Sequence, residues 1–138
     1  MNITQKHLNE LSYQIIGCAI EVHKQLGPGL IESVYEKCFI REISLRNFNF
    51  KNQLWVPIEY KGINLEADLR LDVMVEDLIL VELKAIDGIL PVHEAQVLTY
   101  MKLLRKPKGI LINFNCTNIF KEGQKTFVNE YYSSLPKE

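Results

Sequence analysis

The stretch that most limits how this chain can fold is LDVMVEDLILVELKA, residues 71–85. Its content of Val, Leu and Ile predicts two β-strands joined by a turn. Asp72, Glu82 and Lys84 interrupt these apolar runs, and a buried charge is costly unless it is paired or bound to a metal. The fold therefore has to give these three side chains a solvent-exposed face, ionic partners or a cation.

The length of the turn decides whether the three charges meet. Glu82 and Lys84 are two residues apart on one strand, so their side chains point to the same face. If Asp72 lies opposite Glu82, the turn consists of residues 76–78, a common hairpin size. A two-residue turn would shift the register by one residue and move Asp72 to the other face. A shared site therefore requires a turn with an odd number of residues.

Two interpretations of the hairpin remain open at this point. In the first, two carboxylates and an ammonium group converge, and hard oxygen ligands of this kind suit Mg²⁺ or Mn²⁺. The ammonium group of Lys84 would then orient an attacking water or stabilise developing negative charge. In the second, Glu82 and Lys84 lie on a solvent-exposed face and Asp72 pairs with Arg70 or Lys84. The alternation of apolar residues in the hairpin is compatible with both.

The remaining patterns predict helices and strands around this hairpin. Apolar spacing predicts a first helix with Thr4 as its N-cap, and Gly27-Pro28 ends it. A turn at Lys61-Gly62 joins two strand-like runs. The predicted helices are 4–25, 30–46 and 91–104, and the predicted strands are 54–60, 63–67, 69–75, 79–85, 109–114 and a short one near 125–128. This order predicts a small α/β sandwich with a crossover through one helix.

Length and composition indicate one globular domain over residues 1–138. Apolar residues make up 47% and charged residues 24%, which is ordinary for a soluble protein. There is no apolar run of the roughly 20 residues that a membrane span needs, and the polar N-terminus lacks a signal-peptide core. Three widely spaced cysteines argue against a disulfide framework, a zinc site or an iron–sulfur cluster. We therefore expect a cytoplasmic protein without a membrane partner.

The formal net charge of −1 is distributed unevenly. Residues 66–94 contain eight acids against two bases, whereas residues 95–121 contain five bases and no acid. An acidic centre beside a basic segment is the expected layout of a metal-dependent site that acts on an anion. Ordinary solvated surface charge would give the same pattern, so the charge distribution alone leaves the choice open.

Two motifs outside the hairpin supply possible companions for its charges. Upstream, the run Gly29-x-x-Glu32-x-x-Tyr35 places a carboxylate near the start of the second helix. Downstream, Gln96 and Tyr100 are four residues apart, so they share one face of the third helix.

Together with Asp72-x9-Glu82-x-Lys84, these motifs resemble the PD-(D/E)XK nuclease superfamily, and within it the small GxxExxY proteins. The spacing of Gln96 and Tyr100 also resembles the QxxxY motif of the RecB-like branch. The resemblance covers roughly residues 10–115, through segments in the family's order: GPGLIESVYEKCF, RLDVMVED, ILVELKAI, AQVLTYMKLL and GILINF. It implies a restriction-endonuclease-like α-β-β-β-α-β core, with a mixed central sheet flanked by helices.

The resemblance also implies a role for each matching residue. Asp72 stands at the aspartate of the "PD" motif, and Glu82 and Lys84 stand at the acid and lysine of (D/E)XK. Glu32 matches the helical glutamate that helps to hold the metal, and the carbonyl of Leu83 would face the same ion. The implied metal ligands are thus Glu32, Asp72, Glu82 and Leu83, and the cofactor is Mg²⁺ or Mn²⁺.

Further residues would position the site and contact nucleic acid. Gln96 and Tyr100 match the QxxxY pair, which completes an implied catalytic set with Glu32, Asp72, Glu82 and Lys84. The basic side chains that could grip phosphates are Lys102, Arg105, Lys106 and Lys108. In departure from the family pattern, Leu71 replaces the proline of "PD", and the four-cysteine cluster of some RecB-like nucleases is absent.

Four other side chains near these motifs have simpler explanations. We expect Tyr35 to be a packing residue of its helix. We expect Trp55, on its strand, to lie in the hydrophobic core. We expect His93 to face solvent in the first turn of its helix, and Glu36 to be an ordinary exposed helical glutamate.

Two hypotheses about function follow. The first is a metal-dependent nuclease that hydrolyses phosphodiester bonds, with DNA the expected substrate, and the completeness of the residue set favours it. The second is a catalytically silent nuclease-fold module that binds nucleic acid or a partner protein, favoured by the near-neutral charge and the small size. Whether the chain is an enzyme is thus open, with the first hypothesis ahead, and a homodimer is compatible with either.

Overall fold

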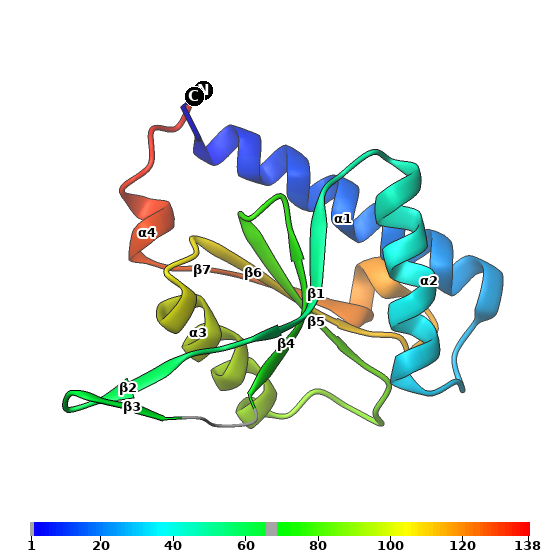
Figure 1. Cartoon of the computed structure of the whole chain (residues 1–138). Coiled ribbons are helices and arrows are strands. Elements are labelled where there is room, and N and C mark those ends of the chain that lie inside the picture. Colours follow the sequence, from blue (N-terminus) through cyan, green and yellow to red (C-terminus); the bar gives the residue numbers. More distant parts are fainter. Residues whose placement is uncertain (1, 66–68) are drawn as a thin grey trace.

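The computed structural model describes residues 2–65 and 69–138, and its centre is a five-stranded mixed sheet (Figure 1). The strands lie in the order β1-β4-β5-β6-β7. β5 and β6 are parallel, and the other neighbours are antiparallel. The strands are β1 (Phe50–Trp55), β4 (Arg70–Val75), β5 (Ile79–Lys84), β6 (Lys108–Asn113) and β7 (Gln124–Val128).

Helices cover both faces of this sheet. Helices α1 (Gln5–Leu26) and α2 (Glu32–Leu45) pack on one face, where the larger apolar cluster lies. The crossover helix α3 (Pro91–Leu104) covers the other face with a smaller cluster. A π-helical turn, η1 (Ile119–Gly123), and a short helix, α4 (Glu130–Ser133), flank β7. The expectation of a restriction-endonuclease-like core with a mixed sheet flanked by helices is confirmed.

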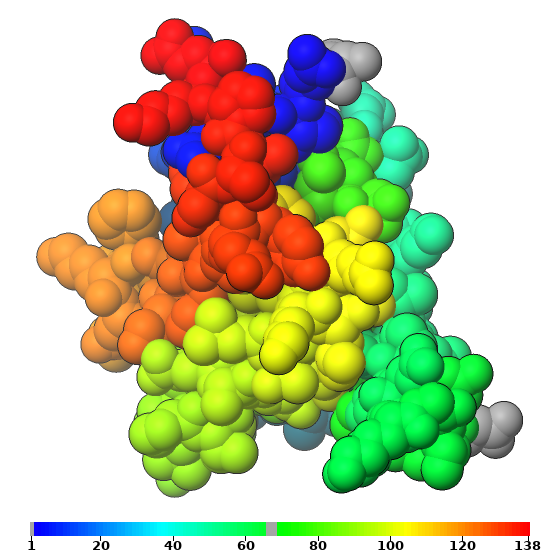
Figure 2. Space-filling view, turned by 90° about the vertical axis from the view of Figure 1, so that its left-hand side faces the viewer, coloured from blue at the N-terminus to red at the C-terminus, as the bar shows by residue number. Residues whose placement is uncertain are grey.

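The start and end of α1 follow the predicted signals. The Thr4 side chain accepts a hydrogen bond from the backbone N–H of His7, at 3.1 Å. Gly27, with φ of 68°, ends the helix in a conformation that favours glycine. The C-terminal segment also contributes, because the carbonyls of Pro136 and Lys137 accept the N–H groups of Gln5 and Lys6 at 2.8 and 3.0 Å. Figure 2 shows this segment, in red, packed against the blue start of the chain.

The predicted strand 54–60 is wrong as a single element. The chain leaves the main sheet after Trp55 and enters a separate two-stranded ribbon, β2 (Ile58–Tyr60) and β3 (Ile63–Leu65), turned by Lys61-Gly62 (Figure 1). Pro57 lies at the break, and a proline cannot donate a ladder hydrogen bond. The last two residues of the predicted strand 63–67 lie outside the described residues.

The expectation that Trp55 lies in the core is also wrong. Its side chain is 55% exposed, and the guanidinium group of Arg70 stacks over the ring at 4.2 Å from the centroid. The reason is position, since β1 is an edge strand and Trp55 is its last residue. No helix in the described part of the chain is long and apolar enough to cross a membrane.

The hairpin between β4 and β5 has the odd-numbered turn that a shared site requires. Val73 pairs with Val81 and Val75 with Ile79, which leaves residues 76–78 as the loop. This register places Asp72 across from Glu82. The geometric condition for a shared site is therefore met.

The contact between α3 and β6 gives a test of the packing. A Cβ atom added to Gly109 would lie 2.8 Å from Val97 Cγ1 and 2.9 Å from Met101 Sδ. We expect Gly109→Ala to lower the free energy of unfolding by about 1–3 kcal/mol in urea titrations, because the added methyl overpacks a close-packed interface. Gly88→Ala is the control, since its Cβ would meet no atom within 4 Å. Equal unfolding midpoints for the two variants would contradict this packing.

Candidate metal and catalytic site

Two hydrogen bonds link Asp72 to β5, one to the side chain of Glu82 and one from the backbone of Leu83. The backbone N–H of Asp72 donates to Glu82 Oε1 at 3.0 Å, and the backbone N–H of Leu83 donates to Asp72 Oδ2 at 2.8 Å. Each carboxylate thus accepts a bond from the neighbouring strand in the position where a ladder carbonyl would stand. Both carboxylates therefore take part in the hydrogen bonding that joins β4 and β5.

The regular alternation of β4 breaks at Asp72. Leu71 packs in the cluster under α3, whereas Val73 packs in the cluster under α1 and α2. In a regular strand these two residues would face the same side. The Asp72 side chain between them belongs to neither apolar cluster, and it lies just beyond the last backbone pair of β4 and β5, Val73 and Val81.

A shallow depression of about 390 Å³ lies at this end of the sheet. The side chains around it come from α2, β4, β5, α3 and the segment before β4. Its lining consists of Glu32, Leu69, Arg70, Asp72, Glu82, Lys84, Gln96 and Tyr100. The structure thus brings together all six residues that the sequence predicts as catalytic.

The helices supply three of these side chains. Glu32 is the first residue of α2 and is exposed, and its Oε1 lies 3.4 Å from the backbone nitrogen of Ala85. On α3, Gln96 Nε2 donates to the Tyr100 hydroxyl at 3.1 Å, and Tyr100 is only 3% exposed. The predicted QxxxY pair is therefore a hydrogen-bonded unit at the edge of the depression.

Burial dominates the electrostatics of the two hairpin acids. Glu82 is only 4% exposed, and burial, reinforced by the charge of Asp72, raises the pKa of its carboxyl to about 8. Burial likewise raises the pKa of Asp72, although the hydrogen bond from Leu83 N opposes the shift. Burial, with the nearby charge of Glu82, also raises the pKa of the Tyr100 hydroxyl. The alternative in which Glu82 decorates a solvent-exposed face is wrong.

The backbone of Leu83 is turned toward β4. Its N–H bonds to Asp72, whereas the carbonyl of the next residue, Lys84, accepts from Phe114 N beside β6 at 2.9 Å. The N–H and C=O of one strand residue point toward the same neighbour, so the carbonyl of Leu83 faces the side of the carboxylates. Its role as a metal ligand remains a prediction.

Two contributors to this site lie outside the set of residues predicted from the sequence. Glu36, one helical turn after Glu32, accepts a hydrogen bond from Gln53 Nε2 at 2.7 Å, and its charge adds to the rise in the pKa of Asp72. Gln53 Nε2 also lies 3.5 Å from Asp72 Oδ1. The four-residue spacing of Glu32 and Glu36 could have pointed to the second acid. The sequence holds no comparable signal for Gln53.

The predicted phosphate-gripping residues do not gather at the depression. Lys106 pairs with Asp77 at 3.0 Å, in the hairpin loop at the far end of β5. Lys108 pairs with Ile79 in the sheet, so it lies a strand length of ~17 Å from Lys84. Lys108 is also buried, with its Nζ bonded to Asn9 at 2.7 Å, which makes it a structural residue. The remaining pair, Lys102 and Arg105, lies at the C-terminal end of α3.

Two other expectations have definite outcomes. Tyr35 is fully buried and stacks on Phe114 with ring centroids 4.4 Å apart, so its predicted packing role is confirmed. His93 is half-buried, and its Nδ1 accepts a hydrogen bond from the backbone N–H of Leu90 at 2.9 Å. His93 thus caps the start of α3 from the first turn, and its hydrogen bond with Leu90 is exposed, in line with the expectation of a solvent-facing side chain.

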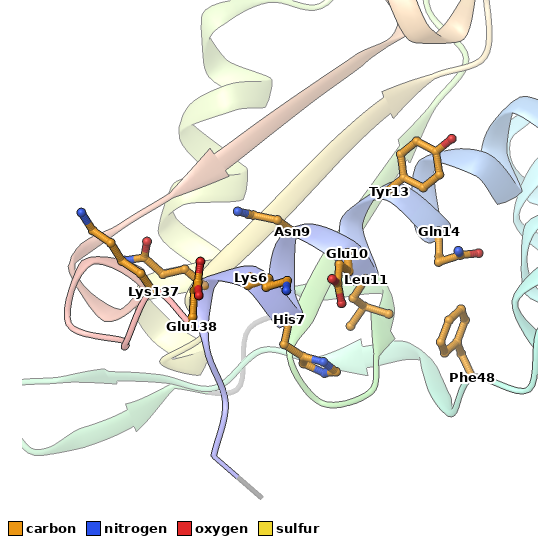
Figure 3. A pocket seen from close by; sticks show the side chains of 11 residues that line it. Lys6, His7, Asn9, Glu10, Leu11, Tyr13, Gln14, Phe48, Lys137 and Glu138 are labelled. Carbon is orange, nitrogen blue, oxygen red and sulfur yellow. The ribbon is translucent and has the colours of Figure 1, made fainter.

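A more voluminous depression, about 810 Å³, lies elsewhere, along the first half of α1 (Figure 3). Its lining mixes side chains of α1 with Phe48 and the C-terminal Lys137 and Glu138. Apolar and unlike charged groups are interspersed there, and no pair of acids is held by backbone N–H groups as in the hairpin. Its volume therefore does not make it the better candidate for chemistry.

The donor set of the hairpin fits a hard, water-rich cation. Among the described residues there is no group of three or more His, Cys, Asp and Glu side chains that could enclose a metal ion. Magnesium needs no such cage, because it keeps several waters and binds through one or two carboxylates together with substrate phosphate. The pair Asp72 and Glu82 meets this requirement, and a cation would offset the cost of burying both charges.

The chain belongs to the PD-(D/E)XK nuclease superfamily, whose pattern it matches over residues 9–127. Members of this superfamily are nucleases that generally use divalent metals, so the family implies nucleic acid as the partner. No curated protein and no solved structure matches the chain significantly. The match covers every element of the site described above.

The raised pKa of Glu82 predicts a pH-dependent stability of the metal-free protein. Folding favours the protonated carboxyl, so this stabilisation is fully present below the unfolded value of 4.5 and is lost as pH rises toward about 8. We expect the free energy of unfolding to fall by on the order of 3 kcal/mol between pH 5 and pH 8.5. Burial is the largest cause of this pKa shift, and Asp72, Lys84 and Glu32 are the neighbouring groups that modify it.

The measurement is urea unfolding with a chelator across this pH range. Glu82→Gln is neutral at every pH and similar in shape, so we expect it to be the more stable protein at pH 8.5 and to show a smaller pH slope. The residual slope reports Asp72, whose pKa is shifted in the same direction. Parallel pH profiles for the wild type and the variant would contradict the raised pKa of the buried Glu82 carboxyl.

Proposed function

We propose that this protein is a metal-dependent nuclease that hydrolyses phosphodiester bonds in nucleic acid, with DNA the expected substrate. The observation that carries the proposal is the shared depression, which collects Glu32, Asp72, Glu82, Lys84, Gln96 and Tyr100 from two helices and two strands. We further assign the chain to the GxxExxY proteins of the RecB-like branch, on the Gly29-x-x-Glu32-x-x-Tyr35 and QxxxY motifs.

Asp72 and Glu82 would hold Mg²⁺ or Mn²⁺, with Glu32 and the carbonyl of Leu83 as further ligands. The bound ion would lower the pKa of a water molecule and offset negative charge on the phosphoryl oxygens. Around it, the hairpin hydrogen bonds fix both carboxylates before any ligand arrives, which is the preorganisation that such chemistry requires.

Lys84 and the QxxxY pair would act on the substrate side of the depression. Lys84 follows Glu82 on the same face of β5, so its ammonium group can orient the attacking water or stabilise developing negative charge. Tyr100 would present a neutral hydroxyl, since its pKa is raised, and Gln96 holds that hydroxyl in place. These two residues would position the scissile strand.

The proposal is tested by cleavage of single-stranded and duplex DNA with Mn²⁺. We expect Asp72→Asn and Lys84→Ala each to lower the cleavage rate at least ~100-fold, because each removes a group that acts on the reacting phosphate. Lys51→Ala is the control, an exposed lysine on β1 near the hairpin-loop end of the sheet. Thermal melts establish that the variants stay folded, and full activity in Lys84→Ala would refute the assigned role.

Metal binding can be measured without any substrate. We expect calorimetry to show one Mn²⁺ site in the wild type and at least ~10-fold weaker binding in Glu82→Gln, because the variant loses a charged ligand. Equal binding in both proteins would place the metal elsewhere. Binding without cleavage of DNA or RNA would favour the silent nuclease-fold module instead.

A further inference from the structure

Gln53 has a backbone conformation that is unexpected inside a strand. Its φ is 52°, in the left-handed region that residues with a Cβ atom adopt at a cost in free energy. The other non-glycine residues with positive φ in the described part of the chain lie in turns or at a helix end. The conformation of Gln53 therefore needs a specific compensation.

The strained residue lies opposite the aspartate of the site. Asn52 pairs with Val73 and Leu54 with Leu71, so the position facing Gln53 on β4 is Asp72. The strand β1 also changes face at this point, since Phe50 packs toward α1 and α2, whereas Leu54 packs toward α3. The irregularities of the two strands coincide at one register position.

The Gln53 side chain connects three elements at this point. Its Nε2 donates to Glu36 Oε1 of α2 at 2.7 Å and lies 3.5 Å from Asp72 Oδ1 of β4. The other oxygen of Asp72 accepts from Leu83 N of β5 at 2.8 Å. The carboxylate of Asp72 is thus contacted on both oxygens, by an amide from each neighbouring strand.

A role in packing alone does not explain this arrangement. The Gln53 side chain is exposed and belongs to neither apolar cluster. Glycine would adopt the same φ at no steric cost. What glutamine adds is a neutral donor between two carboxylates that would otherwise repel each other.

We propose that Gln53 is a positioning residue for the metal site, with Glu36 as the anchor of its amide. The amide fixes the rotation of the Asp72 carboxylate and separates it from Glu36, so that Asp72 meets the cation in one orientation. This inference rests on the proposed function, because it concerns the same Asp72 and Glu82 site.

The test uses the opposite effects of one substitution on stability and on metal binding. Gln53→Gly relieves the backbone conformation, so its unfolding midpoint in urea should equal or exceed that of the wild type. The same variant loses the amide, so its Kd for Mn²⁺ by calorimetry should rise about 10-fold, as is typical when an outer partner of a ligand is removed. In cleavage assays, the half-saturating Mn²⁺ concentration should rise more than the rate at saturating Mn²⁺ falls.

Three further variants make the result specific. Glu36→Gln keeps an acceptor for the Gln53 amide, so its Mn²⁺ affinity should stay within about threefold of the wild type, unlike that of a lost metal ligand. Gln53→Asn tolerates the left-handed conformation but has a shorter side chain, and it should show weakened binding in a stable fold. Asn47→Gly, at φ 63° in the exposed turn after α2, is the matched control and should leave metal binding unchanged.

The outcomes separate this inference from the proposed function. If the wild type binds Mn²⁺, Asp72→Asn abolishes the binding and Gln53→Gly leaves it unchanged, the positioning role is refuted and the metal site stands. If Gln53→Gly lowers stability and affinity together, Gln53 is a structural residue and the inference is wrong. If the wild type binds no divalent ion, both proposals fall.

Discussion

The exchange of hydrogen bonds between Asp72 and its neighbours on β5 is the interaction on which the rest of this structure depends. The cost of burying two acids in a strand is lowered there, because each carboxylate accepts a hydrogen bond from a backbone N–H. Side chains from α2 and α3 line the depression at the same end of the hairpin. Burial then raises the pKa of both acids, because it disfavours their charged forms. A nearby positive charge would favour the charged forms.

Most of the fold was predictable because its signals are local. Thr4 as the N-cap and Gly27 as the end of α1 follow from capping and left-handed φ, and the structure confirms both. The β4–β5 hairpin meets the condition that turn length sets for a shared site. The prediction of one continuous strand over residues 54–60 is wrong because the chain leaves the main sheet at Pro57. The prediction that Trp55 lies in the core is wrong because sequence alone does not show which strand lies at the edge of a sheet.

The candidate site was predictable where motifs carry it and not elsewhere. The six matched residues meet in one depression, although their roles stay predictions until activity is measured. Lys106 and Lys108 follow the site closely in sequence, yet α3 returns the chain to the opposite end of the sheet before they occur. Gln53 could not be found in advance, because its contribution arises from a backbone conformation and a cross-strand neighbour that composition does not encode.

The three-residue turn at 76–78 has a consequence for how such a chain can diverge. The number of residues in the turn matters as much as their identity, since one insertion or deletion would turn Asp72 away from Glu82. The length of this segment is therefore a condition for the site that no single side chain carries. A version of this chain with one residue more or fewer in the turn would keep every site residue and still separate the two acids.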